Sequence, residues 1–210
     1  MSDIRIDTFL SPYVRFVNAC PSVKSADFYY GNTLIQPSLG FGCFSAYYKV
    51  PKGLQEFVIT EAGNKDNVLA TVKLPFGHGD VYTVAAVHSD GSTMAYGIME
   101  PTERKDTDYG HIRVCHLSPN LGSLDISANG YDILGSIDYL ELSRYICIKP
   151  DMYEFRARQN SDGALKLIMP NQNVQSGKYN TIYIVGLSNE KPCLMGIFTV
   201  DAASYTGYYL

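Results

Sequence analysis

Short runs of β-branched and aromatic residues alternate with turn residues along the whole chain, which is typical of β-strands. Turn sequences such as Gly31-Asn32, Gly63-Asn64 and Asp90-Gly91 separate the runs. In the first half the predicted strands lie near 13–18, 26–30, 33–36, 43–50, 55–61, 67–74, 81–88 and 94–99. Neither half has a run of about ten residues with helical apolar spacing. Roughly seven or eight short strands predict an immunoglobulin-like β-sandwich, with an up-and-down barrel as the alternative.

The second half of the chain repeats the first. Val14-Arg15-Phe16-Val17 aligns with Ile112-Arg113-Val114-Cys115 at a separation of 98 residues. Without a gap, residues 13–90 share 14 identities in 78 positions with the second half, where composition alone would give roughly 5. A one-residue shift then aligns Gly97-Ile98 with Gly196-Ile197. The predicted fold class is therefore all-β, with two tandem β-sandwich (immunoglobulin-like) domains.

The repeat also sets the predicted domain boundaries. Residues 13–100 form copy one and residues 111–201 form copy two. Residues 101–110 are the linker, in the most charged stretch of the chain, which is typical of an exposed connection. Residues 1–12 are predicted to be an N-terminal arm, and residues 202–210 a C-terminal tail.

Composition permits two packed cores and argues against nucleic acid as a partner. Hydrophobic residues make up 46% of the chain and charged residues 18%, which favours folded domains over disorder. The formal net charge is -4, and no run of Lys and Arg is interleaved with aromatic residues. Binding to nucleic acid needs a concentrated basic surface, so nucleic acid is excluded as the expected partner.

The sequence gives two indications about localisation. Met1-Ser2-Asp3-Ile4-Arg5 lacks the basic and apolar regions of a signal peptide. No stretch approaches the ~20 apolar residues that span a bilayer, so we expect no transmembrane segment. Three origins fit: a cytoplasmic protein, a protein whose signal has been removed, and a component released by lysis, as for the outer layers of a spore.

Five cysteines, Cys20, Cys43, Cys115, Cys147 and Cys193, form no zinc-finger pattern. Their odd number excludes complete intramolecular pairing. The repeat counterparts of Cys20, Cys115 and Cys147 are not cysteines, so we expect these three thiols to be free. Because free cysteines are among the most buried residues, we expect buried or half-buried thiols. The alternative is intermolecular cross-linking in a surface assembly.

The opening of copy one resembles the bacterial family called domain of unknown function 4397. The run from Val14 to Pro21, followed by Asp27 and Phe28, is similar to the family opening V-R-V-V-H-A-S-P and then V-D-V-Y. Copy two matches this opening more closely, with His116-Leu117-Ser118-Pro119 and Asp125-Ile126. The later family element F-G-x-x-S-x-Y, followed by V-P-x-G, matches residues 41–47 and 50–53.

This resemblance covers nearly the whole chain outside its two ends. It implies β-sandwich modules in tandem, placed on a bacterial surface or secreted. Because the biochemical role of the family is undefined, the resemblance implies no active site. Copy one departs from the family pattern at Asn18 and Cys20, where the family has His and Ser.

None of the four histidines, His78, His88, His111 and His116, is shared between the copies. This excludes a metal site built from repeat-equivalent positions. His111 and His116 are the best nucleus for a site in one copy, but a separation of five residues on a strand puts their side chains on opposite faces. We therefore predict no metal-ligating residue.

His116, Ser118 and Asp125 lie close enough in sequence to suggest a catalytic triad. Ser118 precedes a proline, however, which is ordinary turn chemistry. Asp125 has a twin in Asp27, which no His or Ser accompanies. A structural role for the aspartate explains both copies, so we predict no catalytic residue and no enzyme.

Arg15 and Arg113 are shared, as are Asp27 and Asp125, and all four lie in otherwise apolar strands. If the first two strands form a hairpin centred on the shared proline, each Arg lies opposite its Asp on one face of the sheet. We therefore predict a structural cross-strand ion pair. The alternative is a charge pair that binds a ligand.

Shared Tyr47 and Tyr145 are predicted to pack at the edge of the core with their hydroxyls in water, in preference to stacking on a sugar. Gly40-Phe41-Gly42 and Gly77-His78-Gly79 lack the helix and lysine of a phosphate-binding loop. We therefore expect no cofactor.

Together these patterns favour a non-catalytic structural or interaction protein of a bacterial cell or spore surface, or a secreted one. The alternative is a module that binds carbohydrate or a protein partner, and a hydrolase is the least favoured class. Protein partners, self-association and carbohydrate all fit the sequence. The residues that would bind them are not identified by any pattern in it.

Overall fold

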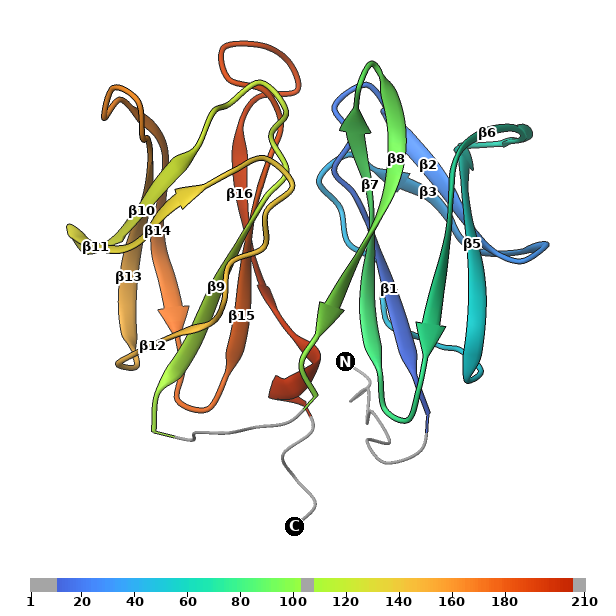
Figure 1. Ribbon diagram of the computed structural model, residues 1–210, viewed down its shortest axis with the longest axis horizontal. Helices are drawn as coiled ribbons and strands as arrows, with labels where there is room; N and C mark the ends of the chain where they lie inside the picture. Colours follow the sequence, from blue (N-terminus) through green and yellow to red (C-terminus); the bar gives the residue numbers. More distant parts are fainter. Residues whose placement is uncertain (1–10, 103–107, 206–210) are drawn as a thin grey trace. The chain divides into compact units, whose positions relative to one another are not determined.

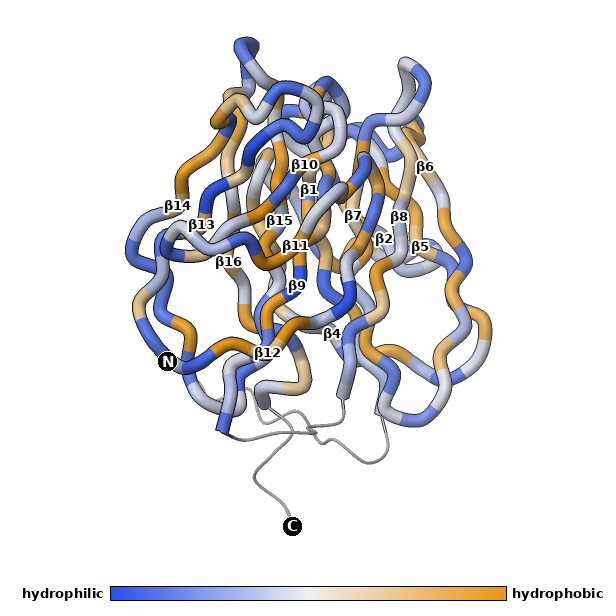
Figure 2. The backbone as a smooth tube through the Cα atoms, turned by 60° about the vertical axis from the view of Figure 1, so that its left-hand side comes forward, coloured by the Kyte–Doolittle hydropathy of each residue, from blue (hydrophilic) through white to orange (hydrophobic). Residues whose placement is uncertain are grey.

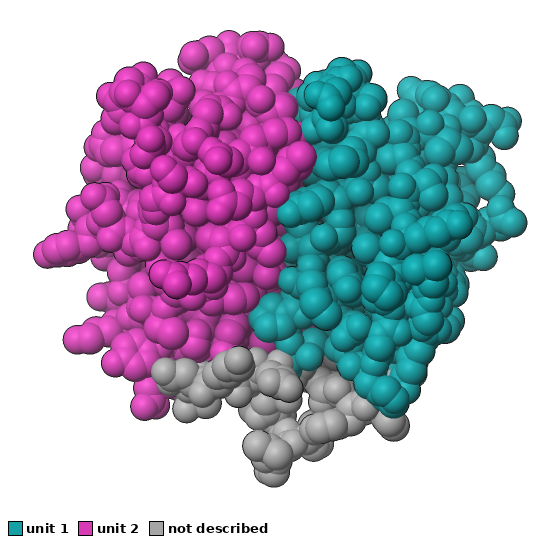
Figure 3. All heavy atoms as spheres, in the orientation of Figure 1, with its two compact units in different colours: residues 1–103, 205–210 teal, residues 104–204 magenta. Residues whose placement is uncertain are grey.

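The computed structural model describes residues 11–102 and 108–205. The chain divides into two compact units, shown in two colours in Figure 3. Among the described residues, unit one holds 11–102 and Tyr205, and unit two holds 108–204. The expected arm at 1–12, the linker at 101–110 and the tail at 202–210 lie partly or mostly outside the described residues.

Unit one consists of two four-stranded sheets, visible in blue to green in Figure 1. The first sheet has the order β4-β1-β7-β8, and the second has the order β3-β2-β5-β6. Strand β1 runs parallel to β7, and the other strand pairs are antiparallel. The strands are β1 (Tyr13–Asn18), β2 (Ser25–Tyr30), β3 (Thr33–Gly40), β4 (Tyr48–Lys49), β5 (Gly53–Glu61), β6 (Asn64–Phe76), β7 (Val81–Ser89) and β8 (Ser92–Glu100).

Unit two repeats this topology, with sheet orders β12-β9-β15-β16 and β11-β10-β13-β14. Strand β9 is again parallel to β15. A short 3-10 helix, η1 (Ala202–Ser204), follows the last strand. The strands are β9 (Gly110–His116), β10 (Leu124–Ala128), β11 (Tyr131–Ile137), β12 (Ile146–Ile148), β13 (Asp151–Gln159), β14 (Leu165–Val174), β15 (Tyr179–Val185) and β16 (Met195–Val200).

The predicted fold class, two tandem β-sandwiches, is confirmed. The alternative of an up-and-down barrel is wrong, because the ladders of each unit separate into two sheets and each unit contains a parallel pair. Within residues 11–102 and 108–205, η1 is the only helix, and no helix there is long and apolar enough to cross a membrane.

Alternate residues of the first strand of each unit enter its core. Val14 and Phe16 of β1 are fully buried, and the Phe16 ring centroid lies 4.8 Å from that of Phe28 on the opposite sheet. Ile112 and Val114 take these positions in β9. Figure 2 shows hydrophobic residues in orange along the strands and hydrophilic ones in blue at many turns. The pleat therefore turns the arginine of each first strand to the other face of its sheet.

The strand predicted at 43–50 is much shorter than expected, because only Tyr48 and Lys49 form β4. In the preceding stretch, Ser45 forms two hydrogen bonds to the backbone of Phe16 in place of regular strand pairing. Its Oγ accepts the Phe16 amide at 2.8 Å, and its own amide donates to the Phe16 carbonyl at 2.9 Å. Ser143 makes the same two contacts with Val114 in unit two. This side-chain bond explains why the serine is shared. Next to it Phe44 forms only an isolated bridge with Val17, as Leu142 does with Cys115 in unit two.

The predicted hairpin between the first two strands is wrong in both copies. Strand β1 belongs to the first sheet and β2 to the second, and β9 and β10 are divided in the same way. The chain crosses from one sheet to the other at the shared proline, so residues on the two strands are not ladder partners. The cross-strand pairing of Arg15 with Asp27, and of Arg113 with Asp125, therefore does not form as predicted.

The predicted alignment of the last strands is also wrong. Thr83 pairs with Ile98, whereas its counterpart Thr181 pairs with Thr199, a residue numbered 101 higher than Ile98. Gly97 is therefore equivalent to Phe198 in the ladder, and not to Gly196. Between equivalent ladder pairs, nine residues separate Val185 from Met195 and six separate Val87 from Met94, so the path from β15 to β16 is three residues longer.

Candidate functional site

A buried polar network surrounds the arginine of unit one. Arg15 Nε donates to Thr83 Oγ1 at 2.8 Å and forms an ion pair with Glu100 Oε1 at 2.9 Å. Thr83 Oγ1 donates to the same carboxylate, and the Tyr47 hydroxyl donates to Glu100 Oε2 at 2.6 Å. The guanidinium carbon lies 4.9 Å from the centre of the Tyr47 ring and 5.0 Å from that of Phe44. The Glu100 side chain is fully buried, so the network is closed to a ligand.

Unit two contains the same network with an aspartate in place of the glutamate. Arg113 Nε donates to Thr181 Oγ1 at 2.8 Å, and both the Thr181 and Tyr145 hydroxyls donate to Asp201 Oδ2 at 2.5 Å. Burial, together with the negative charge of Asp201, raises the pKa of Tyr145, which therefore stays protonated as a donor. The guanidinium carbon lies 4.7 Å from the centre of the Tyr145 ring.

The structural interpretation of the shared arginine is thus retained, but its partner was misassigned. Likewise, the prediction that the Tyr47 and Tyr145 hydroxyls lie in water is wrong, because both bind a buried carboxylate. Glu100 and Asp201 were missed because they differ in residue type and because the longer connection before β16 breaks the constant spacing of 98 residues. The structure shows that the two carboxylates are equivalent. Glu100 lies opposite Val81, and Asp201 donates its amide to the carbonyl of Tyr179, which is the counterpart of Val81.

The shared aspartates hold a bulge in the second sheet of each unit. Asp27 Oδ1 accepts the Ser38 amide at 2.7 Å, and its Oδ2 accepts the Gly63 amide at 2.9 Å. Asp125 Oδ1 accepts the Ser136 amide at 2.9 Å. Both serines have a positive φ, 47° and 52°, beside a register shift in their strand pair. The carboxylate therefore stabilises a strained backbone position in each copy.

Asn18 and His116 occupy the same position and perform the same task. Asn18 Oδ1 accepts the Cys20 amide at 3.3 Å, while its Nδ2 donates to the Val23 carbonyl at 2.9 Å. In unit two His116 Nδ1 accepts the Ser118 amide at 3.3 Å, and Nε2 lies 3.2 Å from the Gly122 carbonyl. This pattern requires a neutral imidazole with its proton on Nε2. Asn18 of copy one, where the family has His, therefore keeps the hydrogen bonds that His116 makes to the loop after β9 in copy two.

The neutral state of His116 predicts a pH dependence of stability. Burial lowers the pKa of His116, and hydrogen bonding to Gly122 offsets only part of this effect. Because the unfolded chain takes up the proton first, stability is fully present above about pH 6.5 and falls as the pH decreases below it, by at most about 1.4 kcal/mol per pH unit. Urea unfolding of the full chain between about pH 5 and 7.5 measures this slope. His116→Asn, which copies Asn18, should remove it.

An exposed histidine supplies the control for this experiment. His78→Asn changes a solvent-exposed side chain of unit one and should leave the wild-type slope in place. If His116→Asn and wild type lost stability in parallel below pH 6.5, His116 would not be the group responsible.

The suggested triad does not form a nucleophile and base. The Ser118 hydroxyl is fully buried and donates to the Gly186 carbonyl at 2.7 Å, so it does not point to the imidazole. Asp125 receives hydrogen bonds from Ser136 and from the Asn160 side chain. His116 and Ser118 meet only through the Ser118 backbone amide, and Asp125 has other partners, so the hydroxyl, the imidazole and the carboxylate do not form a relay.

His111 and His116 do not converge on a common ligand. The His111 ring stacks on Tyr179 at 4.0 Å between centroids, while His116 faces the loop after β9. Within the described parts of the chain, no group of three or more His, Cys, Asp and Glu side chains could hold a metal ion.

All five cysteines are free thiols, but their burial differs from the expectation. Cys20 and Cys115 are buried, whereas Cys43, Cys147 and Cys193 are exposed. Burial raises the pKa of the Cys115 thiol to about 12, so this thiol remains protonated and unreactive. The expectation of buried or half-buried thiols is therefore wrong for three of the five.

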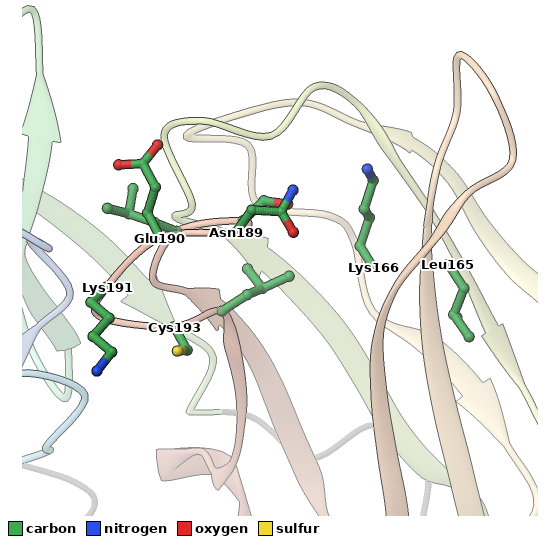
Figure 4. Close-up of a pocket in the computed structure, with 9 residues that line it drawn as sticks. Leu165, Lys166, Asn189, Glu190, Lys191 and Cys193 are labelled. Carbon is green, nitrogen blue, oxygen red and sulfur yellow. The ribbon is translucent and has the colours of Figure 1, made fainter.

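A pocket of about 510 Å³ opens in unit two beside the long connection between β15 and β16 (Figure 4). It has three leucines and a set of polar residues, and no aromatic ring. Lys166, at the start of β14, and Lys191, in the connection, have no ion-pair partner among the described residues. The residues that line the pocket are Leu165, Lys166, Leu187, Ser188, Asn189, Glu190, Lys191, Cys193 and Leu194.

Side chains from the loop between β9 and β10 hold this connection in place. Asn120 Oδ1 accepts the Ser188 amide at 2.8 Å, and its Nδ2 donates to the Ser188 carbonyl at 3.1 Å and to Glu190 Oε1 at 3.3 Å. Ser118 binds the carbonyl of Gly186 at the beginning of the connection. Unit one joins its equivalent strands by the two-residue turn Asp90-Gly91, so the long connection that lines this pocket is a feature of unit two. In the sequence alone, the extra length is visible only as a shift of the alignment between the copies.

The chain matches one protein family twice. The family model described as Domain of unknown function (DUF4397) matches residues 12–127 and residues 110–204. The chain belongs to the DUF4397 family. The two matches begin 98 residues apart, which is the separation of the repeats, and they overlap over residues 110–127. The predicted resemblance is therefore confirmed. A comparison with curated proteins gives no match.

Two solved structures are similar to this DUF4397 protein at low identity. One is CBMbc (family CBM26) from Eubacterium rectale Amy13K in complex with maltoheptaose, at 14% identity over 91% of this chain and 96% of that chain, with a TM-score of 0.26. The other is a putative polysaccharide binding protein (DUF1812) from Bacteroides thetaiotaomicron, at 9% identity over 92% and 96%, also with a TM-score of 0.26. The assignment of the β-sandwich fold rests on the strand ladders and does not depend on these similarities.

Proposed function

We propose that this protein is a non-catalytic interaction protein of a bacterial surface, and that unit two binds an acidic segment of a protein partner. The observation that carries this proposal is the pocket beside the β15–β16 connection, where three leucines and two lysines that have no ion-pair partner in the described part of the chain line one cavity. The shared arginines and aspartates are committed to hydrogen bonds and ion pairs within their own domain, which leaves the part that differs between the copies for recognition.

The lining chemistry favours a peptide over a sugar. Sugar-binding sites commonly use an exposed aromatic ring as a stacking surface, and none lines this pocket. Leu165, Leu187 and Leu194 instead offer apolar contact, which suits an aliphatic side chain.

The charge of the pocket favours an acidic segment. Glu190 shares its carboxylate with the Asn120 amide, whereas Lys166 and Lys191 remain available to pair with an incoming carboxylate. This local positive charge contrasts with the net charge of -4 for the whole chain.

Selection of short random peptides displayed on phage, against the full chain, tests this proposal. We expect enriched peptides to combine an acidic residue with an aliphatic one. Lys166→Glu and Lys191→Glu should each weaken the binding of a selected peptide by about tenfold, which is about 1.4 kcal/mol. Isothermal titration measures these affinities. Lys149→Glu, at an exposed position outside the pocket, is the matched control and should change the affinity little.

Two results would contradict the proposal. One is a set of peptides that binds wild type and both charge-reversed variants equally well. The other is selective retention of neutral glycans on an array, which would assign the pocket to carbohydrate. The surface location has its own test, because protease treatment of intact cells should remove the protein if it is displayed outside.

A further inference from the structure

Cys147 and His111 are direct partners in the antiparallel pair of β12 and β9. The Cys147 Sγ lies 3.4 Å from His111 Nδ1, within hydrogen-bonding distance for sulfur. The thiol is at the surface, whereas the histidine is only 4% exposed. The imidazole is also held in orientation, because it stacks almost parallel on the Tyr179 ring, with an angle of 8° between the planes. An accessible nucleophile thus contacts a base that a third group positions.

This pair is not a requirement of the domain. At the same ladder position in unit one, Lys49 lies opposite Tyr13, and the strands pair in the same way. The other two exposed cysteines, Cys43 and Cys193, have no side-chain hydrogen bond to their thiols within the described residues. Cys147 is therefore distinguished from them by its contact with His111.

We infer that Cys147 is a modification site that forms a mixed disulfide with low-molecular-weight disulfides. The thiol proton passes from Sγ to His111 Nδ1, and the thiolate attacks one sulfur of the incoming disulfide. A new S–S bond forms to Cys147 as the original S–S bond breaks. The departing thiolate takes the proton back from the imidazole. One disulfide and one thiol are consumed, and one of each is produced, so no other oxidant is needed. This inference is independent of the proposed peptide site.

Reaction of the native full chain with 5,5′-dithiobis(2-nitrobenzoic acid), followed by peptide mass mapping, tests this inference. We expect Cys147 to react about tenfold faster than Cys43 and Cys193. Oxidised glutathione should then give its adduct first at Cys147. His111→Tyr, which introduces the residue that unit one carries, should slow Cys147 by about tenfold and leave the other two rates unchanged.

Two internal controls separate proton acceptance from loosening of the strand. Buried Cys115 must stay unreactive in His111→Tyr, because its modification would report local opening. Lys49→Cys places a thiol at the matched position without a histidine and should react slowly. Should His111→Tyr expose Cys115, the comparison moves to unit one, where Lys49→Cys with Tyr13→His must react faster than Lys49→Cys alone. Equal rates there, or a Cys147 rate that is unchanged in an intact His111→Tyr variant, would overturn the inference.

Discussion

Glu100→Ala should lower the free energy of unfolding of unit one by about 3–5 kcal/mol. The reason is that the Arg15 side chain, 5% exposed, would stay buried after losing the carboxylate 2.9 Å from its Nε. The Tyr47 hydroxyl would lose its acceptor at the same time. Urea unfolding of the full chain, with hydrogen exchange to assign the loss to unit one, measures this effect.

An exposed ion pair in the same unit provides the matched comparison. Glu56 lies 3.1 Å from Lys73, with side chains that are 44% and 59% exposed, so Glu56→Ala should cost less than about 1 kcal/mol. Arg15→Met combined with Glu100→Leu should be milder than Glu100→Ala, because neither charge is left buried alone. Equal costs for Glu100→Ala and Glu56→Ala would show that burial does not govern the pair.

Gly186→Ala should destabilise unit two by about 3 kcal/mol and abolish binding at the pocket. Gly186 has a φ of 89°, which disfavours any side chain, and a Cβ there would lie 2.2 Å from the backbone oxygen of Cys193. The obstacle is main chain, so the connection must move to relieve it. Thermal unfolding of the full chain and titration with a selected peptide give the two readouts.

Gly130 separates the two sources of this cost. It has a similar φ of 86°, but a Cβ there would have no atom within 4 Å. Gly130→Ala therefore carries the backbone strain without the collision and should cost about 1 kcal/mol, with peptide binding intact. If the two variants were equally destabilised, the close approach of Cys193 to Gly186 would have no energetic importance.

The fold followed from the sequence because its signals are local and occur twice. In the first strand, apolar residues at every second position, such as Val14 and Phe16, identify the face that is buried. Ile112 and Val114 repeat this pattern in the second copy, which confirms the two-residue period of a strand. The pairing of strands did not follow, since the hairpin expected at the shared proline assumed that neighbours in sequence are neighbours in a sheet. The crossover between sheets is decided by long-range packing, which the pattern of one strand does not contain.

The candidate sites were less predictable, for a related reason. Arg15 and Arg113 stand out in the sequence because they lie in apolar strands. Their carboxylate partners come at the end of each domain's sequence and differ in residue type, so the pairing is not visible there. The contact between Cys147 and His111 was not predictable, because nothing in their spacing shows that they are ladder partners. The pocket depends on how the β15–β16 connection folds back through bonds to Asn120.

The longer connection that precedes Asp201 shows where such a domain tolerates insertions. Strands β15 and β16 keep the register of β7 and β8 on both sides of a connection that is three residues longer. The carboxylate of each network therefore reaches its arginine with either length of connection. Segments of different length and chemistry can be exchanged at this end of the sandwich while the buried network at the other end of the strands stays in place. The connection can therefore vary in length and sequence while the rest of the sandwich is conserved in structure, and a tandem pair can present two different connections in one chain.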